Sequence, residues 1–235
     1  MSRLFVTGTG TGIGKTFVSA AIAHAATKAG QTVRAFKPVA SGIADHDLRD
    51  SDPGVLLQAI GVTPSLEAVN AISPWRYTKP VAPYLAAAGE GREVPYGEVV
   101  DFSKEALRGP EDLILIEGIG GVMAPVDRLH SVLDWVSALS IPTILVAGTY
   151  VGTISHTLTA LGVLRAAGVR VLAIVLNETQ GSPVSAAEQG TAIGLFAGGV
   201  PIYVLPYVEG ERSWMRVPCG ALTDAILRKP ACAAT

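Results

Sequence analysis

An apolar stretch followed at once by a glycine-rich turn opens the chain and reads Leu4-Phe5-Val6-Thr7-Gly8-Thr9-Gly10-Thr11-Gly12-Ile13-Gly14-Lys15-Thr16. Its first three residues are typical of a buried strand, and the pattern after Thr16 is typical of a helix. Glycines let the backbone N–H groups of the turn point inward, and the start of a helix adds unpaired N–H groups and a positive dipole end. The stretch therefore predicts a phosphate-binding loop between the first strand and the first helix.

The same turn indicates what kind of phosphate it would bind. In loops of the pattern G-x-x-x-x-G-K-[ST], the lysine contacts the β- and γ-phosphates and the hydroxyl ligates Mg²⁺, and these roles fall to Lys15 and Thr16. The match is a variant one, because Thr9 stands where the pattern has its first glycine. A dinucleotide site would also use G-x-G pieces, but the Gly-Lys-Thr ending suits a triphosphate with magnesium better. The expected nucleotide contacts in this segment are Gly12, Ile13, Gly14, Lys15, Thr16 and Phe17.

Short apolar runs rich in Val, Ile and Leu recur along the chain, at residues 4–6, 33–36, 113–116, 143–146, 171–176 and 202–205. Such runs without polar alternation are typical of strands buried on both faces of a parallel sheet. Helical patterns lie between them, at residues 16–29, 53–60, 132–139, 154–167 and 185–196. Prolines interrupt residues 62–108, which favours loops with short helices there. The alternation predicts a single-domain α/β fold, a doubly wound, mostly parallel β-sheet flanked by helices, like that of P-loop nucleotide hydrolases.

The composition narrows the class of protein. The 235 residues are 49% hydrophobic and 16% charged with a net charge of −2, so we predict one folded domain over residues 1–229 and a C-terminal tail over residues 230–235. Without a block of basic residues, neither nucleic acid nor a membrane is an expected partner. Cys219 and Cys232 predict free thiols, no export signal is visible, and we expect a cytoplasmic protein.

Two charged residues follow strands whose carboxyl ends should meet at one edge of the sheet. Glu117 comes directly after residues 113–116, and Lys37 comes after residues 33–36. Ligands bind at that edge in open parallel sheets, so Glu117 would face the phosphate loop as a magnesium ligand and Lys37 would lie near the γ-phosphate. Each also has a simpler interpretation, as a solvated charge at the end of a strand.

A further carboxylate, Asp52, precedes Pro53 at the expected start of a helix. It is either a metal ligand or the N-cap of that helix, because aspartate is a preferred N-cap and proline suits the first helical position. Nearby competitors for the metal role are Asp45, Asp47 and Asp50.

Three segments taken together, residues 8–16, 37–42 and 117–121, resemble the dethiobiotin synthetase family. The string Lys-Pro-Val-Ala-Ser-Gly at residues 37–42 is specific, whereas Gly-Lys-Thr alone would not be. The resemblance extends from the first strand to about Glu211 and implies a seven-stranded, mostly parallel sheet and a homodimer with shared active sites. It also implies Mg²⁺ as the cofactor, with Thr16, Asp52 and Glu117 as ligands, which favours Asp52 over its rivals.

The resemblance assigns roles to further residues. It implies that Lys15 and Lys37 are catalytic and hold the carbamate and the γ-phosphate. The implied nucleotide contacts are Asp52, Glu117, Gly118, Ile119, Gly120, Asn177, Glu178, Pro206, Tyr207 and Val208. Among them, the Asn177 amide would read the edge of the adenine base, and residues 206–208 would form the second wall of the base pocket. The implied substrate contacts are Thr11, Ser41, Val151, Gly152 and Ser155, the last three reaching the site of the partner subunit. Gly10 and Gly12 stand where some family members have acidic residues, and Ser155 stands where an asparagine is often found.

The activity that the resemblance implies is the ATP-dependent, ring-closing carboxylation of 7,8-diaminononanoate with CO2 or bicarbonate to dethiobiotin, ADP and phosphate, in biotin biosynthesis. The diamine would form a carbamate and then a mixed carbamic-phosphoric anhydride. The alternative from another class is a nucleotide-switch ATPase of the partitioning or division-site type. Its loop would carry an extra lysine near the first glycine, where this chain has Thr9, Gly10 and Thr11.

Overall fold

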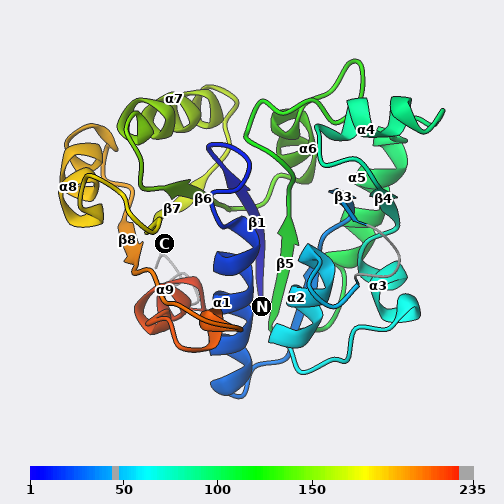
Figure 1. Cartoon of the computed structure of the whole chain (residues 1–235), viewed down its shortest axis with the longest axis horizontal. Helices are drawn as coiled ribbons and strands as arrows, with labels where there is room; N and C mark the ends of the chain where they lie inside the picture. The colour runs from blue at the N-terminus through cyan, green and yellow to red at the C-terminus, as the bar shows by residue number, and fades with distance from the viewer. Residues whose placement is uncertain (44–47, 228–235) are drawn as a thin grey trace, which may run out of the picture.

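The computed structural model describes residues 1–43 and 48–227, and a six-stranded sheet runs through its centre (Figure 1). The strand order is β2-β5-β1-β6-β7-β8, and all neighbouring pairs are parallel. The strands are β1 (Ser2–Gly8), β2 (Val33–Phe36), β5 (Leu113–Glu117), β6 (Thr143–Gly148), β7 (Val171–Asn177) and β8 (Ile202–Leu205). Each of the six predicted strands is confirmed. Uninterrupted apolar runs form such strands because a parallel sheet covered by helices buries both faces of each strand.

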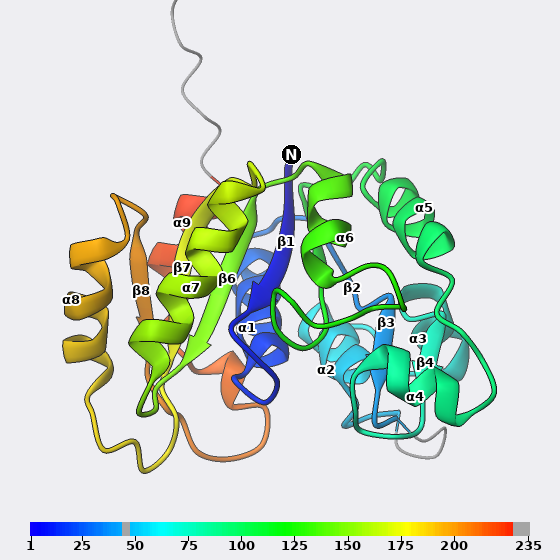
Figure 2. The same cartoon turned by 90° about the horizontal axis from the view of Figure 1, so that it is seen from above.

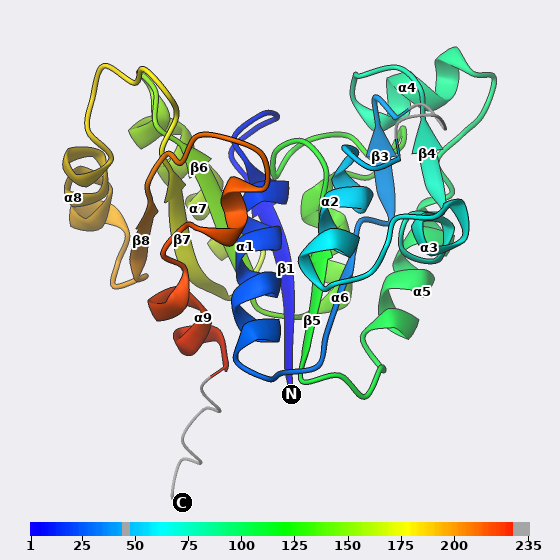
Figure 3. The same ribbon diagram turned by 60° about the horizontal axis from the view of Figure 1, so that its bottom comes forward.

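Helices cover both faces of this sheet, which confirms the doubly wound prediction. On one face lie α1 (Lys15–Lys28), α2 (Asp52–Ala59) and α9 (Gly220–Leu227), as Figure 3 shows. On the other lie α5 (Tyr96–Ala106), α6 (Val132–Leu139) and α7 (Thr153–Ala166), as Figure 2 shows. At the edge, α8 (Ala186–Phe196) flanks β8. The five predicted helices are all present, within two residues at their ends.

The structure departs from the sequence-based expectations on one side of the sheet. The central sheet has six strands within the described residues, where the resemblance implied seven. The strands β3 (Val39–Ser41) and β4 (Trp75–Tyr77) instead form a separate two-stranded parallel sheet. Pro38 separates β2 from β3, and a residue without an N–H group cannot continue the ladder with β5. Residues 62–108 contain short helices as predicted, namely α3 (Leu66–Ile72), α4 (Pro83–Gly89) and α5.

Local signals end the helices where the sequence indicated. Gly30 and Gly168 follow the ends of α1 and α7 with φ of 79° and 73°, a left-handed conformation that glycine adopts without strain. Among the described residues, no helix has both the length and the apolar character needed to cross a membrane. The predicted tail over residues 230–235 and Cys232 lie outside the described residues, so the domain boundary at residue 229 stays a prediction.

Candidate functional site

The site lies where three neighbouring strands, β2, β5 and β1, reach the same edge of the sheet. The register pairs Val6 with Glu117 and Phe36 with Ile116, so the ends of these strands lie level with one another. Residues 8–14 leave β1 at this edge, and α1 begins directly after them at Lys15. The topology therefore brings together the phosphate loop, the residue after β2 and the last residue of β5, as the sequence predicted.

Lys37 is the centre of the charged cluster. Its Nζ donates to Glu117 Oε1 at 2.6 Å and to the Gly118 carbonyl at 2.8 Å, and it lies 3.2 Å from Asp52 Oδ2. Only 2% of Lys37 is exposed, so the interpretation of a solvated surface lysine is wrong. Burial lowers the pKa of Lys37, but the nearby Glu117 and Asp52 carboxylates outweigh it and leave the pKa raised. The side chain is therefore an ammonium ion at neutral pH.

Glu117 is fully buried and faces the phosphate loop. Its Oε1 also accepts a hydrogen bond from Thr16 Oγ1 at 2.7 Å, which excludes the solvated interpretation of this residue. Its second oxygen, Oε2, is buried without a hydrogen-bond partner. A buried carboxylate oxygen of this kind calls for a donor or a cation.

Asp52 is not the N-cap of α2. That position belongs to Ser51, whose Oγ accepts from the Gly54 amide at 3.3 Å, and Asp52 is the first helical residue. Its side chain is free to turn toward Lys37. Burial raises the pKa of Asp52, but the Lys37 ammonium outweighs burial and leaves the pKa below its ordinary value. The carboxyl is therefore ionised at neutral pH. Of its competitors, Asp50 lines a different, polar pocket, and residues 45 and 47 lie outside the described residues.

The donor set fits Mg²⁺. Thr16, Asp52 and Glu117 offer hydroxyl and carboxylate oxygens around one point, which are the ligands that this hard cation prefers. The unpartnered Oε2 of Glu117 is an independent sign that a positive group belongs beside it. Mg²⁺ takes octahedral coordination, so three protein ligands would leave positions for phosphate oxygens and water.

Lys15 lies across the phosphate loop. Its Nζ donates to the Gly10 carbonyl at 2.7 Å, and the side chain is largely buried. Burial, followed by repulsion from Lys37, lowers the pKa of Lys15 to about 8, although Glu117 and Asp52 act in the opposite direction. A buried lysine that has only a backbone partner is poised to bind an anion.

The two expected walls of the base pocket lie side by side. The Tyr207 amide donates to Glu178 Oε2 at 3.1 Å, and the Glu178 amide donates to the Leu205 carbonyl at 2.9 Å. These contacts join the ends of β7 and β8, so residues 177–178 and 206–208 are neighbours. Phe17 and Val208 are partly buried and pack against the hydrophobic core.

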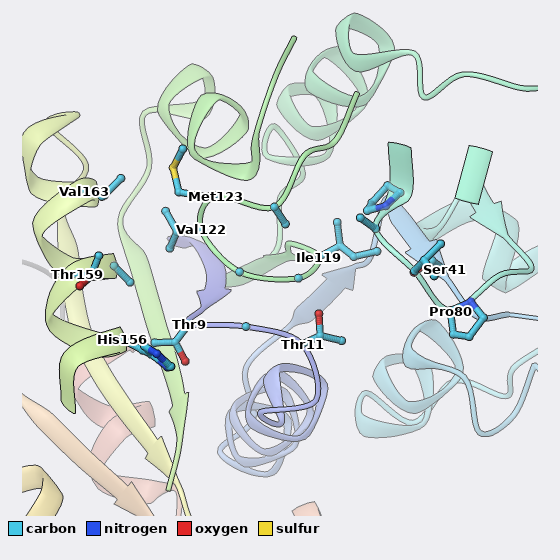
Figure 4. Close-up of a pocket in the computed structure, with 18 residues that line it drawn as sticks. Thr9, Thr11, Ser41, Pro80, Ile119, Val122, Met123, His156, Thr159 and Val163 are labelled. Atoms are coloured by element: carbon cyan, nitrogen blue, oxygen red, sulfur yellow. The ribbon is translucent and has the colours of Figure 1, made fainter. Parts of the chain in front are cut away.

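A cavity of about 710 Å³ opens beside the phosphate loop (Figure 4). Two of the expected substrate contacts, Thr11 and Ser41, line it, and so do Ile119 and Gly120, which the family resemblance assigns to the nucleotide. The sequence did not indicate the remaining walls, which include Pro80, Val122, Met123, His156, Thr159 and Val163. The Gly120-Gly121 pair was a partial signal, because a Cβ at Gly121 would lie 3.1 Å from the Thr9 carbonyl oxygen. Gly121 thus lets this loop pass close to the phosphate loop.

Three predicted substrate residues do not line this cavity. Val151, Gly152 and Ser155 lie at the start of α7 and are exposed, Val151 to 78%. Gly152 is the N-cap of α7 with φ of 101°. The Thr153 amide donates to the Tyr150 carbonyl at 3.1 Å, whereas Ile154 and Ser155 in the same turn are exposed. Within one chain the structure therefore does not bring this segment to the other substrate residues.

Two kinds of comparison place the fold among known structural classes. A family model described as an AAA domain matches residues 2–205. The septum site-determining protein MinD of Pyrococcus horikoshii, complexed with Mg-ADP, is 20% identical with a TM-score of 0.53, covering 96% of this chain and 93% of that chain. The MinD cell division protein of Aquifex aeolicus is 16% identical with a TM-score of 0.53, covering 97% and 95%. The chain thus has the fold of P-loop nucleotide hydrolases, and because such likeness shows the fold alone, it does not favour the switch-ATPase alternative.

Sequence relatives identify the family within this class. The ATP-dependent dethiobiotin synthetase of Caulobacter sp. (strain K31) is 45% identical over 228 residues, which cover 97% of this chain and 95% of that protein. The enzyme of the same name from Acidiphilium cryptum (strain JF-5) is 42% identical over 215 residues, covering 91% and 96%. The chain belongs to the ATP-dependent dethiobiotin synthetase family, as its motifs predicted.

Proposed function

We propose that this protein catalyses the ATP- and Mg²⁺-dependent closure of a cyclic urea from 7,8-diaminononanoate and CO2, giving dethiobiotin, ADP and phosphate. The observation that carries the proposal is the convergence of Lys37, Glu117, Asp52 and Thr16 beside Lys15 and the phosphate loop. An apolar-walled cavity that can hold a chain of carbon atoms opens beside this loop.

The chemistry needs positioning and charge neutralisation more than a side-chain nucleophile. One amine of the substrate adds to CO2, loses a proton and becomes a carbamate. A carbamate oxygen then attacks the γ-phosphorus and ADP leaves. The second amine attacks the carbonyl carbon, and phosphate departs as the ring closes.

The residues of the chain divide this work among them. Lys15 and Lys37 place two positive charges beside the phosphate loop, where the carbamate and the γ-phosphate must approach each other despite their negative charges. Thr11 and Ser41 lie at the cavity wall and can hydrogen-bond the diamine end. Thr16, Asp52 and Glu117 would hold Mg²⁺, which supplies charge neutralisation at the phosphates when bound.

The test is the release of phosphate from ATP in the presence of each substrate combination. We expect turnover only when diamine and bicarbonate are present together, and we expect dethiobiotin to form in equal amount to phosphate. Lys37→Met should lose more than 90% of the rate, which corresponds to about 1.4 kcal/mol of transition-state stabilisation. Phosphate release that ignores the diamine would refute the proposal.

We also propose that two subunits share each site, with the start of α7 binding the substrate carboxylate of the neighbouring subunit. Ile154 and Ser155 are exposed in the first turn of α7, where the N–H groups of a helix can bind an anion, and this supports the role. Ser155→Trp keeps the backbone of Gly152 intact and should raise the KM for the diamine far more than the KM for ATP. Mixing Ser155→Trp subunits with Lys37→Ala subunits creates one site with both defects and one with neither, so activity should return. No recovery after confirmed subunit exchange would contradict the shared site.

A further inference from the structure

Asn177, the last residue of β7, touches the phosphate loop directly. Its Nδ2 donates to the Ile13 carbonyl at 3.1 Å. Gly14, the residue after Ile13, has φ of 90°, and a Cβ at Gly14 would lie only 2.1 Å from Asn177 Nδ2. The asparagine amide therefore occupies the space in which any side chain at position 14 would sit. The absence of a side chain at Gly14 is what allows the contact.

The side chain of Ile13 holds the same peptide from another direction. Ile13 is buried, and a Cβ on Gly8 would lie 2.4 Å from its Cδ1. A Cβ on Gly148, in β6, would lie 3.6 Å from its Cγ2. Gly8 thus makes room for the Ile13 side chain, which packs beside Gly148 at an ordinary distance, while Asn177 holds the Ile13 carbonyl. The peptide that joins residues 13 and 14 is fixed by both.

This peptide sets the start of α1. Gly14 is the N-cap of the helix, and its carbonyl accepts a hydrogen bond from the Val18 amide at 2.9 Å. Lys15 and Thr16 follow it immediately. A shift of the peptide would move their N–H groups, the Lys15 ammonium and the Thr16 hydroxyl together, which are the groups that a triphosphate would contact.

We propose that Asn177 is a positioning residue for the phosphate loop, and that it acts on triphosphate binding through the Ile13–Gly14 peptide, independently of any contact with the nucleotide base. An asparagine amide has two N–H donors and one carbonyl acceptor. Because one N–H group of the Asn177 side chain donates to the Ile13 carbonyl, its other N–H group and its carbonyl oxygen are left for a base. The inference rests on the proposed nucleotide site and adds a physical link from the base pocket to the phosphates.

A ligand without a base separates the two roles of Asn177. Binding of magnesium tripolyphosphate and of Mg-ATP is measured by calorimetry on the full chain. Asn177→Ala should weaken tripolyphosphate binding about three- to tenfold, the equivalent of one lost hydrogen bond. Tyr207→Ala is the matched control, because it alters the expected base pocket alone and should weaken only ATP. If Asn177→Ala bound tripolyphosphate as the wild type does and ATP more weakly, Asn177 would contact only the base, and the proposal would be overturned.

Amide exchange of the ligand-free protein tests the contact without any ligand. The Val18 amide reports on Gly14, and it should exchange faster in Asn177→Ala and in Asn177→Asp, which keeps the shape but has no N–H group to donate. Tyr207→Ala should exchange at the wild-type rate. Wild-type exchange in both Asn177 variants would overturn the proposal. If the wild-type protein binds neither ligand, the proposed function fails, and exchange at Val18 still decides whether Asn177 positions the loop.

Discussion

Replacing Lys37 by methionine should reveal how much stability the buried charge cluster involves. The substitution keeps an unbranched side chain, which is shorter by its terminal atom, and removes three contacts of Nζ, with Glu117, Asp52 and the Gly118 carbonyl. The side chain of Asp52 is 46% exposed and can turn to water, whereas Glu117 is fully buried and cannot. The cost therefore falls mainly on Glu117.

Leaving one partner of a buried ion pair uncompensated costs about 3–5 kcal/mol. A domain of this size loses about 2–4 °C of Tm per kcal/mol, so we expect Lys37→Met to melt about 6–20 °C below the wild type. Folding should survive, since natural domains have about 5–15 kcal/mol of stability. Urea unfolding at a fixed protein concentration, followed by tryptophan fluorescence, measures the loss as a change in free energy of unfolding.

The double variant Lys37→Met/Glu117→Gln is the decisive comparison. It removes both charges, and we expect it to be more stable than Lys37→Met alone by about 2 kcal/mol, because neighbouring sites in one ion pair are not additive. Its turnover should stay as low as that of Lys37→Met, since the catalytic charge is still missing. A loss below about 1 kcal/mol for Lys37→Met, or a double variant that shows the sum of the single losses, would refute the reasoning.

Three further outcomes are expected. Glu117→Gln and Asp52→Asn should each raise the Mg²⁺ concentration for half-maximal activity while the KM for the diamine stays near the wild-type value; a silent Asp52→Asn would return that residue to a structural role. Burial raises the pKa of Cys219 to about 11, so in a Cys232→Ser background its alkylation at pH 8 should be slow as long as the protein is folded. The free energy of unfolding should fall as the pH rises from about 9 toward 11, because only the thiol of the unfolded protein ionises in that range. Rapid alkylation of the folded protein would contradict this. Ser131→Ala removes the N-cap of α6 and should lower the free energy of unfolding in urea by about 1 kcal/mol, whereas the control Ser137→Ala should lower it by less than about 0.5 kcal/mol. The hydrogen bond from Ser131 lowers the pKa of Asp134. The difference in stability between the two variants should therefore shrink as the pH falls below the ordinary range of a carboxyl.

The sheet was predictable because its strands are buried on both faces. A run such as residues 113–116 has no polar alternation, and no other environment in a folded domain accepts it. The parallel order then predicts that Glu117 and Lys37 lie at one edge of the sheet. The strands β3 and β4 were not predicted, because three-residue strands between prolines carry too little periodicity to be recognised.

The site was predictable where its residues follow strands and unpredictable where they do not. Ser51 and Asp52 are both good N-caps, and a shift of one residue decides which of them can reach Lys37. The cavity wall at Pro80 comes from the segment that prolines interrupt. The contact between Asn177 and Ile13 joins residues 164 apart in the sequence, and no local pattern encodes it.

The charges of the site explain how such a cluster can be buried. Lys15 and Lys37 are balanced by Asp52 and Glu117, and each buried ammonium has an oxygen partner. A nucleoside triphosphate would bring more negative charge than a single Mg²⁺ neutralises, and the two lysines would supply positive charge for the rest. Glu117 Oε1 and Asp52 Oδ2 orient Lys37, whereas Glu117 Oε2 has no hydrogen-bond partner among the described residues and is the oxygen that remains for the cation. The same carboxylates would thus hold Lys37 in place and provide ligands for the metal.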